Sequence, residues 1–200
     1  MKKKHFYLSL VMVIVAVGIL TAVISSGKGK IGSVESSSEV SGNIQFENAI
    51  GKRAPDFELE NTNGAKVSLK QLRGKAIVLF FNEGSMCYPA CWNQVKELAA
   101  DQRLNNDQIQ AYSIVDESKG AWQSIMKKQP EYSTDKMLFD TSRKVSLAYD
   151  VLSLPSSMHK GAFPGHTYIV IDKEGIIRYV LDDPSMAIRN DQILAEAQKI

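Results

Sequence analysis

The chain has 200 residues, of which 44% are hydrophobic, and a formal net charge of +2. This length supports one ordinary hydrophobic core and an appendage. Residues 1–48 hold five lysines and three glutamates, and the rest balances nineteen basic against nineteen acidic side chains, which excludes nucleic acid as an expected partner because a neutral domain exerts no field on phosphates.

The N-terminal segment has the features of a membrane anchor. Lys2, Lys3 and Lys4 precede an uncharged stretch from Phe6 to Ile24, which at ~1.5 Å rise per residue is long enough to cross a bilayer as one helix. The residues after it form a poor cleavage site, which favours an uncleaved signal anchor over residues 1–24, although a cleaved signal is the alternative. Three lysines before the stretch against Lys28 and Lys30 after it predict an extracytoplasmic C-terminal domain. The anchor, the tether that follows it and the lack of a eukaryotic-looking address indicate a single-pass protein of a bacterial cell membrane.

Residues 25–48 are rich in Ser and Gly, and this composition predicts a flexible linker. The folded domain is predicted over residues 49–200. It opens with an N-terminal β-hairpin, in which residues 54–59 and 66–69 form the strands and the turn lies at residues 61–64.

The remaining pattern alternates strands and helices. The run 76–81 is apolar at every position, as expected for a central strand that is covered on both faces. Further strands are predicted at 109–115, 137–139, 167–171 and 176–181, and helices at 92–104, 119–129, 142–149 and 190–199. This order predicts an α/β fold with a central mixed β-sheet sandwiched by helices.

The two cysteines of the chain, Cys87 and Cys91, lie where the apolar strand gives way to a helix. The N–H groups and dipole of a helix N-terminus stabilise a thiolate, so this position suits redox chemistry. Pro89 favours a loop or first-turn position between them. We expect Cys87 to be the more exposed, attacking thiolate and Cys91 to resolve the mixed disulfide. The alternative is a structural disulfide, although so short a loop gains little stability from one.

Several segments together resemble the redoxin branch of the thioredoxin superfamily. They are residues 54–57, residues 69–75, the apolar strand, the cysteine pair and residues 169–177, and the resemblance covers residues 51–200. This branch includes the alkyl hydroperoxide reductase/thiol-specific antioxidant proteins and membrane-tethered thiol-disulfide oxidoreductases. The resemblance implies a thioredoxin-like fold and an oxidoreductase without an organic cofactor. Its partners would be protein thiols and disulfides or a small peroxide, together with an electron-donor redox protein.

The chain departs from this family at three places. Three residues separate its cysteines, where thioredoxins have two. The residues before Cys87 lack the proline and the threonine or serine of peroxiredoxins, which argues against peroxidase activity. His166 stands where the thioredoxin pattern has a cis-proline. We hypothesise that His166 joins Cys87 and Cys91 as a catalytic residue, either by holding Cys87 as a thiolate or by transferring a proton. The alternative is a loop histidine without a role.

Other functions stay open. Cys87, Cys91 and His166 also resemble the copper ligands of the Sco-type copper chaperones, since thiolate and imidazole suit copper, but Trp92 replaces the proline of that family. A third possibility is a non-enzymatic extracellular binding module. Glu83, which precedes the cysteine loop, is either a solvated turn residue or a water-mediated proton relay.

Overall fold

The structure is a computed structural model that describes residues 42–200. The anchor predicted over residues 1–24 and most of the predicted linker lie outside the described residues. Within residues 42–200, none of the helices combines the length and the apolar character that crossing a membrane requires.

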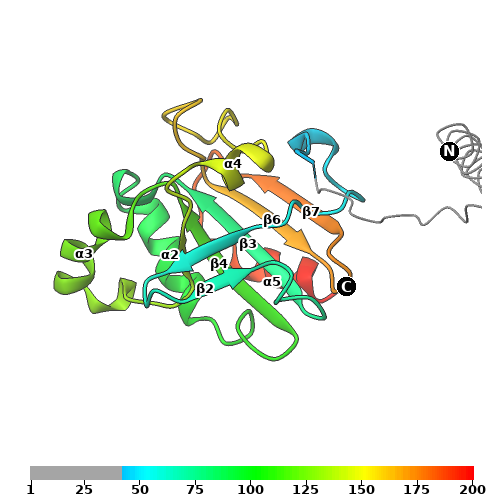
Figure 1. Cartoon of the computed structure of the whole chain (residues 1–200), viewed down its shortest axis with the longest axis horizontal. Helices are drawn as coiled ribbons and strands as arrows, with labels where there is room; N and C mark the ends of the chain where they lie inside the picture. Colours follow the sequence, from blue (N-terminus) through cyan, green and yellow to red (C-terminus); the bar gives the residue numbers. More distant parts are fainter. Residues whose placement is uncertain (1–41) are drawn as a thin grey trace, which may run out of the picture. The chain divides into compact units, whose positions relative to one another are not determined.

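A seven-stranded sheet forms the centre of the domain, in the order β2-β1-β5-β4-β3-β6-β7 (Figure 1). The strands are β1 (Glu58–Asn61), β2 (Lys66–Ser68), β3 (Ala76–Asn82), β4 (Ile109–Val115), β5 (Met137–Phe139), β6 (Thr167–Ile171) and β7 (Ile177–Asp182). Strands β3, β4 and β5 pair in parallel, and all other pairings are antiparallel. The expectation of a mixed sheet is confirmed.

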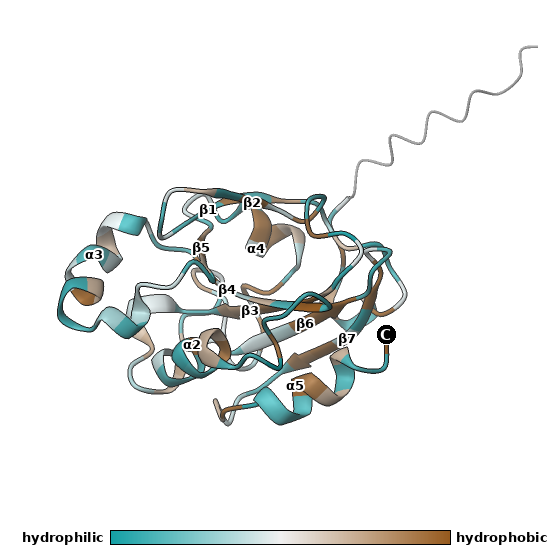
Figure 2. Cartoon of the chain, turned by 90° about the horizontal axis from the view of Figure 1, so that it is seen from below, coloured by the Kyte–Doolittle hydropathy of each residue, from teal (hydrophilic) through white to brown (hydrophobic). Residues whose placement is uncertain are grey.

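Helices cover both faces of this sheet (Figure 2). They are α2 (Ala90–Ala100), α3 (Lys119–Lys128), α4 (Lys144–Ala148) and α5 (Asn190–Ala197), with three 3-10 turns, η1 (Phe46–Asn48), η2 (Gly84–Met86) and η3 (Pro130–Tyr132). Helices α2 and α5 lie on one side of the sheet and α4 lies on the other (Figure 2). The domain therefore has the predicted sandwich architecture.

Strand β3 divides the core in two because its side chains alternate between the faces of the sheet. Val78 and Phe80 pack with buried residues of α2, α3 and α5. Leu79 and Phe81 pack on the opposite face with η1, α4 and the hairpin. Every residue of β3 is buried. The end of this strand is consequently a fixed point from which the cysteine loop departs.

Several predicted boundaries differ from the structure by a few residues, and two of the differences concern the start of the domain. Strand β1 begins at Glu58, because Arg53 bridges to Ile176 and the N–H of Ala54 donates to Gly175 O instead. The folded part also begins before the predicted boundary at residue 49. Phe46 of η1 is buried in the core, so the last residues of the predicted linker pack on the domain.

Candidate active site

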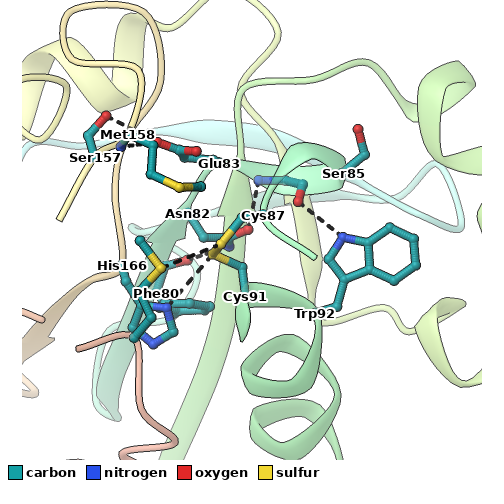
Figure 3. The surroundings of a disulfide bond; sticks show 12 residues. Phe80, Asn82, Glu83, Ser85, Cys87, Cys91, Trp92, Ser157, Met158 and His166 are labelled. Carbon is teal, nitrogen blue, oxygen red and sulfur yellow. Dashed lines mark hydrogen bonds between the residues drawn. A yellow bond between two sulfur atoms is a disulfide. The ribbon is translucent and has the colours of Figure 1, made fainter. Parts of the chain in front are cut away.

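A disulfide joins Cys87 and Cys91 at the point where β3 leads into α2 (Figure 3). The S–S distance is 2.08 Å and the two Cα atoms lie 5.3 Å apart. Cys87 lies in the loop that follows η2, and Cys91 lies in the first turn of α2. The Tyr88–Pro89 peptide bond between them is cis. Cys87 thus has the loop position that Pro89 favoured.

Both cysteines are buried in this disulfide form. Cys87 is 2% exposed and Cys91 is 1% exposed. Cys87 is therefore the more exposed of the two by only a marginal amount, and the accessible thiol expected at Cys87 is not seen in this state. The reason is a contact from a distant loop, in which Met186 Sδ lies 4.0 Å from Cys87 Sγ.

Glu117, two residues beyond the end of β4, fixes the turn that carries Cys87. Its carboxylate accepts hydrogen bonds from the Ser85 N–H at 2.8 Å and from Trp122 Nε1 at 2.6 Å. Trp92 of α2 donates from Nε1 to Gly84 O at 3.2 Å. Gly84 has a φ of 66°, and a Cβ there would collide with the Glu117 carboxylate. The turn that precedes Cys87 is thus fixed by Glu117, which follows β4, and by Trp92 of α2.

Glu83 anchors the long loop of residues 152–165 beside the disulfide (Figure 3). Its side chain is buried and accepts hydrogen bonds from the N–H of Met158 at 2.6 Å and of His159 at 3.1 Å. The ring Nδ1 of His159 also lies 3.1 Å from its second oxygen. The prediction that Glu83 is a solvated turn residue is wrong, because this loop folds over it.

His166 lies fully buried at the start of β6, and its imidazole faces the disulfide (Figure 3). Its Nδ1 is 3.8 Å from Cys91 Sγ, and its Nε2 is 3.1 Å from Ala187 O and 2.9 Å from the hydroxyl of Tyr168. A carbonyl oxygen only accepts, so the contact with Ala187 places the hydrogen on Nε2 and leaves the Nδ1 lone pair toward Cys91. Burial lowers the pKa of His166 to about 4, which keeps the ring neutral near pH 7.

The structure therefore brings together all three predicted site residues but changes their pairing. His166 contacts Cys91, whereas Cys87 Sγ contacts Met186. The hypothesis that His166 holds Cys87 as a thiolate is not supported by this geometry. A role on the proton of Cys91 fits it.

Gly165, the residue before His166, packs directly against the long loop. A Cβ on Gly165 would collide with the Ser156 side chain and with the backbone of Ser156 and Ser157. Ser157 in turn donates from Oγ to Glu83 at 3.2 Å. Only glycine lets the long loop pass this close to the residue before His166.

A pair of buried carboxyl groups lies one strand further along the sheet, and the sequence interpretation missed it. Asp116 and Asp140 follow β4 and β5 directly, and Ser146 links them by donating from Oγ to Asp116 and from N–H to Asp140, each at 2.7 Å. Within residues 42–200, Asp116 Oδ2 and Asp140 Oδ1 have no hydrogen-bond partner. Burial raises the pKa of Asp116 to about 7, and Asp140 adds to this effect. An acidic residue directly after each apolar strand was the available signal.

No group of three or more His, Cys, Asp or Glu side chains in the described part of the chain is arranged to hold a metal ion. In the disulfide form both cysteine sulfurs are bonded to each other. Copper binding by Cys87, Cys91 and His166 stays a prediction for the reduced form.

The sequence is similar to a known protein family and to individual members of it. Residues 50–180 match the model of the AhpC/TSA family. The thiol-disulfide oxidoreductase ResA of Bacillus subtilis is 36% identical over 110 residues, which are 54% of this chain and 59% of ResA. Peroxiredoxin Bcp of the same organism is 30% identical over 131 residues, which are 63% of this chain and 80% of Bcp. The chain thus spans less than two thirds of the length of ResA.

Solved structures share the fold. The crystal structure of Enterococcus faecalis AhpC matches with a TM-score of 0.64 and 17% identity, over 76% of this chain and 92% of that one. Peroxidoxin BcpB from Mycobacterium tuberculosis matches with a TM-score of 0.61 and 21% identity, over 76% and 97%. At these identities the likeness establishes the thioredoxin-like peroxiredoxin fold.

Proposed function

The chain belongs to the AhpC/TSA family, and we propose that within it this protein is a thiol-disulfide oxidoreductase that works through Cys87 and Cys91. The observation that carries the proposal is the Cys87–Cys91 disulfide, with Cys91 in the first turn of α2 and the unprotonated nitrogen of His166 3.8 Å from its sulfur. Similarity to ResA, which is named a thiol-disulfide oxidoreductase, supports the same reading.

The proposed reaction transfers two electrons from the reduced pair to a substrate disulfide. The Cys87 thiolate attacks one sulfur of the substrate, the substrate S–S bond breaks, and one substrate thiolate leaves. Cys91 then gives its proton to His166 and attacks Cys87 Sγ, the bond between Cys87 and the substrate breaks, and the second substrate thiolate leaves and takes the proton from His166. The protein ends as the Cys87–Cys91 disulfide, and an electron-donor redox protein returns it to the dithiol.

His166 sets the order of these steps. A neutral imidazole that turns its lone pair toward Cys91 accepts a hydrogen bond from the thiol and disfavours the thiolate. Cys91 therefore stays protonated in the dithiol while Cys87 is free to attack. The same Nδ1 is the nearest acceptor when Cys91 must lose its proton, so His166 is proposed to act at the second step.

Peroxide reduction is a close variant, which the similarity to peroxiredoxin Bcp favours. The Cys87 thiolate would attack one peroxide oxygen, the O–O bond would break with the other oxygen leaving as water or an alcohol, and Cys87 would become a sulfenic acid. Cys91 would then displace water from it to form the disulfide. The residues that precede a peroxidatic cysteine in peroxiredoxins are absent before Cys87. Disulfide exchange is therefore the primary proposal and antioxidant activity the secondary one.

We also propose that residues 1–24 tether this domain to the outer face of a bacterial cytoplasmic membrane. The support is the run of three lysines followed by the uncharged stretch from Phe6 to Ile24. An extracytoplasmic compartment is oxidising, which allows a disulfide to form and persist. The partners would then be extracytoplasmic protein thiols and disulfides.

One assay tests both parts of the proposal on the full chain expressed in bacteria. Washed membranes that carry the protein are expected to reduce the disulfides of insulin with dithiothreitol as donor, faster than they consume hydrogen peroxide. Membranes with the Cys87→Ser variant serve as the control. Faster peroxide consumption would make the protein a peroxidase, and activity confined to the soluble fraction would contradict the tether. No activity of either kind would favour the non-enzymatic binding module.

A further inference from the structure

Cys87 is covered although its chain neighbours are exposed. Met86 is 49% exposed and Tyr88 is 70% exposed, whereas Cys87 itself is 2% exposed. Its cover therefore comes from elsewhere in the chain. Met186, in the loop between β7 and α5, is half-buried and places its sulfur 4.0 Å from Cys87 Sγ.

The loop that carries Met186 is built to a fixed shape. The buried carboxylate of Asp183 accepts hydrogen bonds from the N–H of Ser185 and of Ala187, each at 3.1 Å. Arg189 donates to the same carboxylate from Nε at 2.7 Å. Met186 has a φ of 51°, a left-handed conformation that non-glycine residues rarely adopt. The backbone that carries the Met186 side chain is thus held in a defined conformation.

His166 ties this loop to the other half of the disulfide. Its carbonyl accepts the N–H of Asp183 at 2.9 Å, and its Nε2 donates to Ala187 O at 3.1 Å. The loop is therefore fastened on either side of Met186 to the residue that faces Cys91. One unit, His166 with the loop of residues 183–187, thus contacts both sulfurs of the disulfide.

From this arrangement we propose that Met186 is a specificity-determining residue that caps Cys87 against small thiols. The inference rests on the proposed function and adds to it which thiols reach the disulfide. To reduce the protein, an incoming thiolate must attack Cys87 Sγ and form a mixed disulfide with it, while the bond to Cys91 breaks and Cys91 leaves as the thiol with the proton of the incoming thiol. A second thiol, from the same dithiol or from another glutathione, then attacks the mixed disulfide and releases Cys87 as a thiol. The first attack requires the cap to move.

The Met186 cap is proposed to discriminate between thiols by the contacts that each makes away from its reacting sulfur. A polypeptide dithiol can bind exposed apolar side chains around the disulfide, and that binding energy offsets the displacement of Met186. Four large apolar side chains on segments next to the disulfide or to Met186 are exposed, namely Met86, Tyr88, Met158 and Ile188. Glutathione has little apolar surface that could contact these side chains, so no binding energy offsets the free energy needed to displace Met186 from Cys87.

The test measures stoichiometric reduction of the Cys87–Cys91 disulfide in the full chain, by acid quenching, thiol alkylation and mass spectrometry. Glutathione and the dithiol form of a thioredoxin are the two reductants. Met186→Ala is expected to raise the glutathione rate about tenfold, as the loss of a modest barrier would, and to leave the thioredoxin rate within about twofold. Met186→Leu, which keeps the apolar volume, should behave as the wild type.

Two further variants complete the design. Glycine adopts a φ of 51° without strain, so Met186→Gly should raise the rate of reduction by glutathione as much as Met186→Ala does. Agreement between the two variants would show that the effect does not come from backbone strain in the alanine variant. Leu147→Ala removes an exposed apolar side chain of α4, away from the disulfide, and should not change the glutathione rate. Equal acceleration of both reductants, or none with either, would overturn the proposal. This readout needs no turnover, and the insulin assay supplies its small donor thiol in large excess, which outweighs a tenfold barrier, so the two tests can fail or succeed separately.

Discussion

Replacement of Cys91 by serine is expected to stop turnover and to leave the substrate covalently bound to Cys87. Cys87 can still attack a substrate disulfide, but a serine hydroxyl cannot displace the substrate from the mixed disulfide. Insulin reduction should fall on the order of 100-fold or more, because the two residues act as one unit. Non-reducing electrophoresis and mass spectrometry of the adduct locate the bond.

The matched variant is Cys87→Ser, which leaves Cys91 as the remaining thiol. Because Cys91 is buried and faces the lone pair of His166, this variant should be inactive and should form no adduct. An adduct through Cys91 in this variant, together with none through Cys87 in the other, would reverse the two roles. His166 would then act on the attacking cysteine at the first step, and not on the resolving cysteine at the second.

The free energy of unfolding is expected to fall as the pH rises through the titration of Asp116. This carboxyl has an ordinary pKa of 3.8 and a pKa of about 7 in the folded protein, chiefly because it is buried. Between these values the folded state binds a proton that the unfolded state has released, so stability is lost with rising pH. The full effect is on the order of 4 kcal/mol.

His166 acts in the opposite direction. Burial lowers its pKa from 6.5 to about 4, so the unfolded state binds the extra proton and stability rises with pH across that window, on the order of 3 kcal/mol. The two effects offset each other below pH 6.5. Above it, the fall that Asp116 causes should remain alone.

Urea unfolding between pH 4 and pH 8 measures this balance. Asp116→Asn should gain stability relative to the wild type as the pH rises, and the difference should level off above pH 7. Asp107→Asn, at an exposed position, is the control and should run parallel to the wild type. A constant difference between Asp116→Asn and the wild type would show that Asp116 titrates normally.

Much of the fold could be predicted from local sequence. The uniformly apolar run of β3 predicted a strand covered on both faces, and the cysteines were placed at the entrance to a helix, as found. The pairing of β1 with β5 could not be predicted, because it joins short strands far apart in the chain. Local patterns define elements, whereas their neighbours in the sheet depend on the whole topology.

The site was predictable only in its cysteines and in His166. Glu83 and Glu117 read as ordinary polar residues after strands, because their partners lie in the loop of residues 152–165 and in the turn before Cys87. Met186 carried no signal at all, since its contact with Cys87 joins residues 99 positions apart. Sequence located the reacting sulfurs, but the fold determines what holds and covers them.

The central claim is that the Cys87–Cys91 disulfide is made and broken reversibly in the folded protein. Its most direct measurement is equilibration of the full chain with mixtures of reduced and oxidised dithiothreitol, followed by alkylation and mass spectrometry. We expect both thiols to become labelled together in one reversible two-electron transition while the protein stays folded. Labelling of neither thiol until the protein unfolds would identify the bond as structural and rule out the proposed oxidoreductase activity.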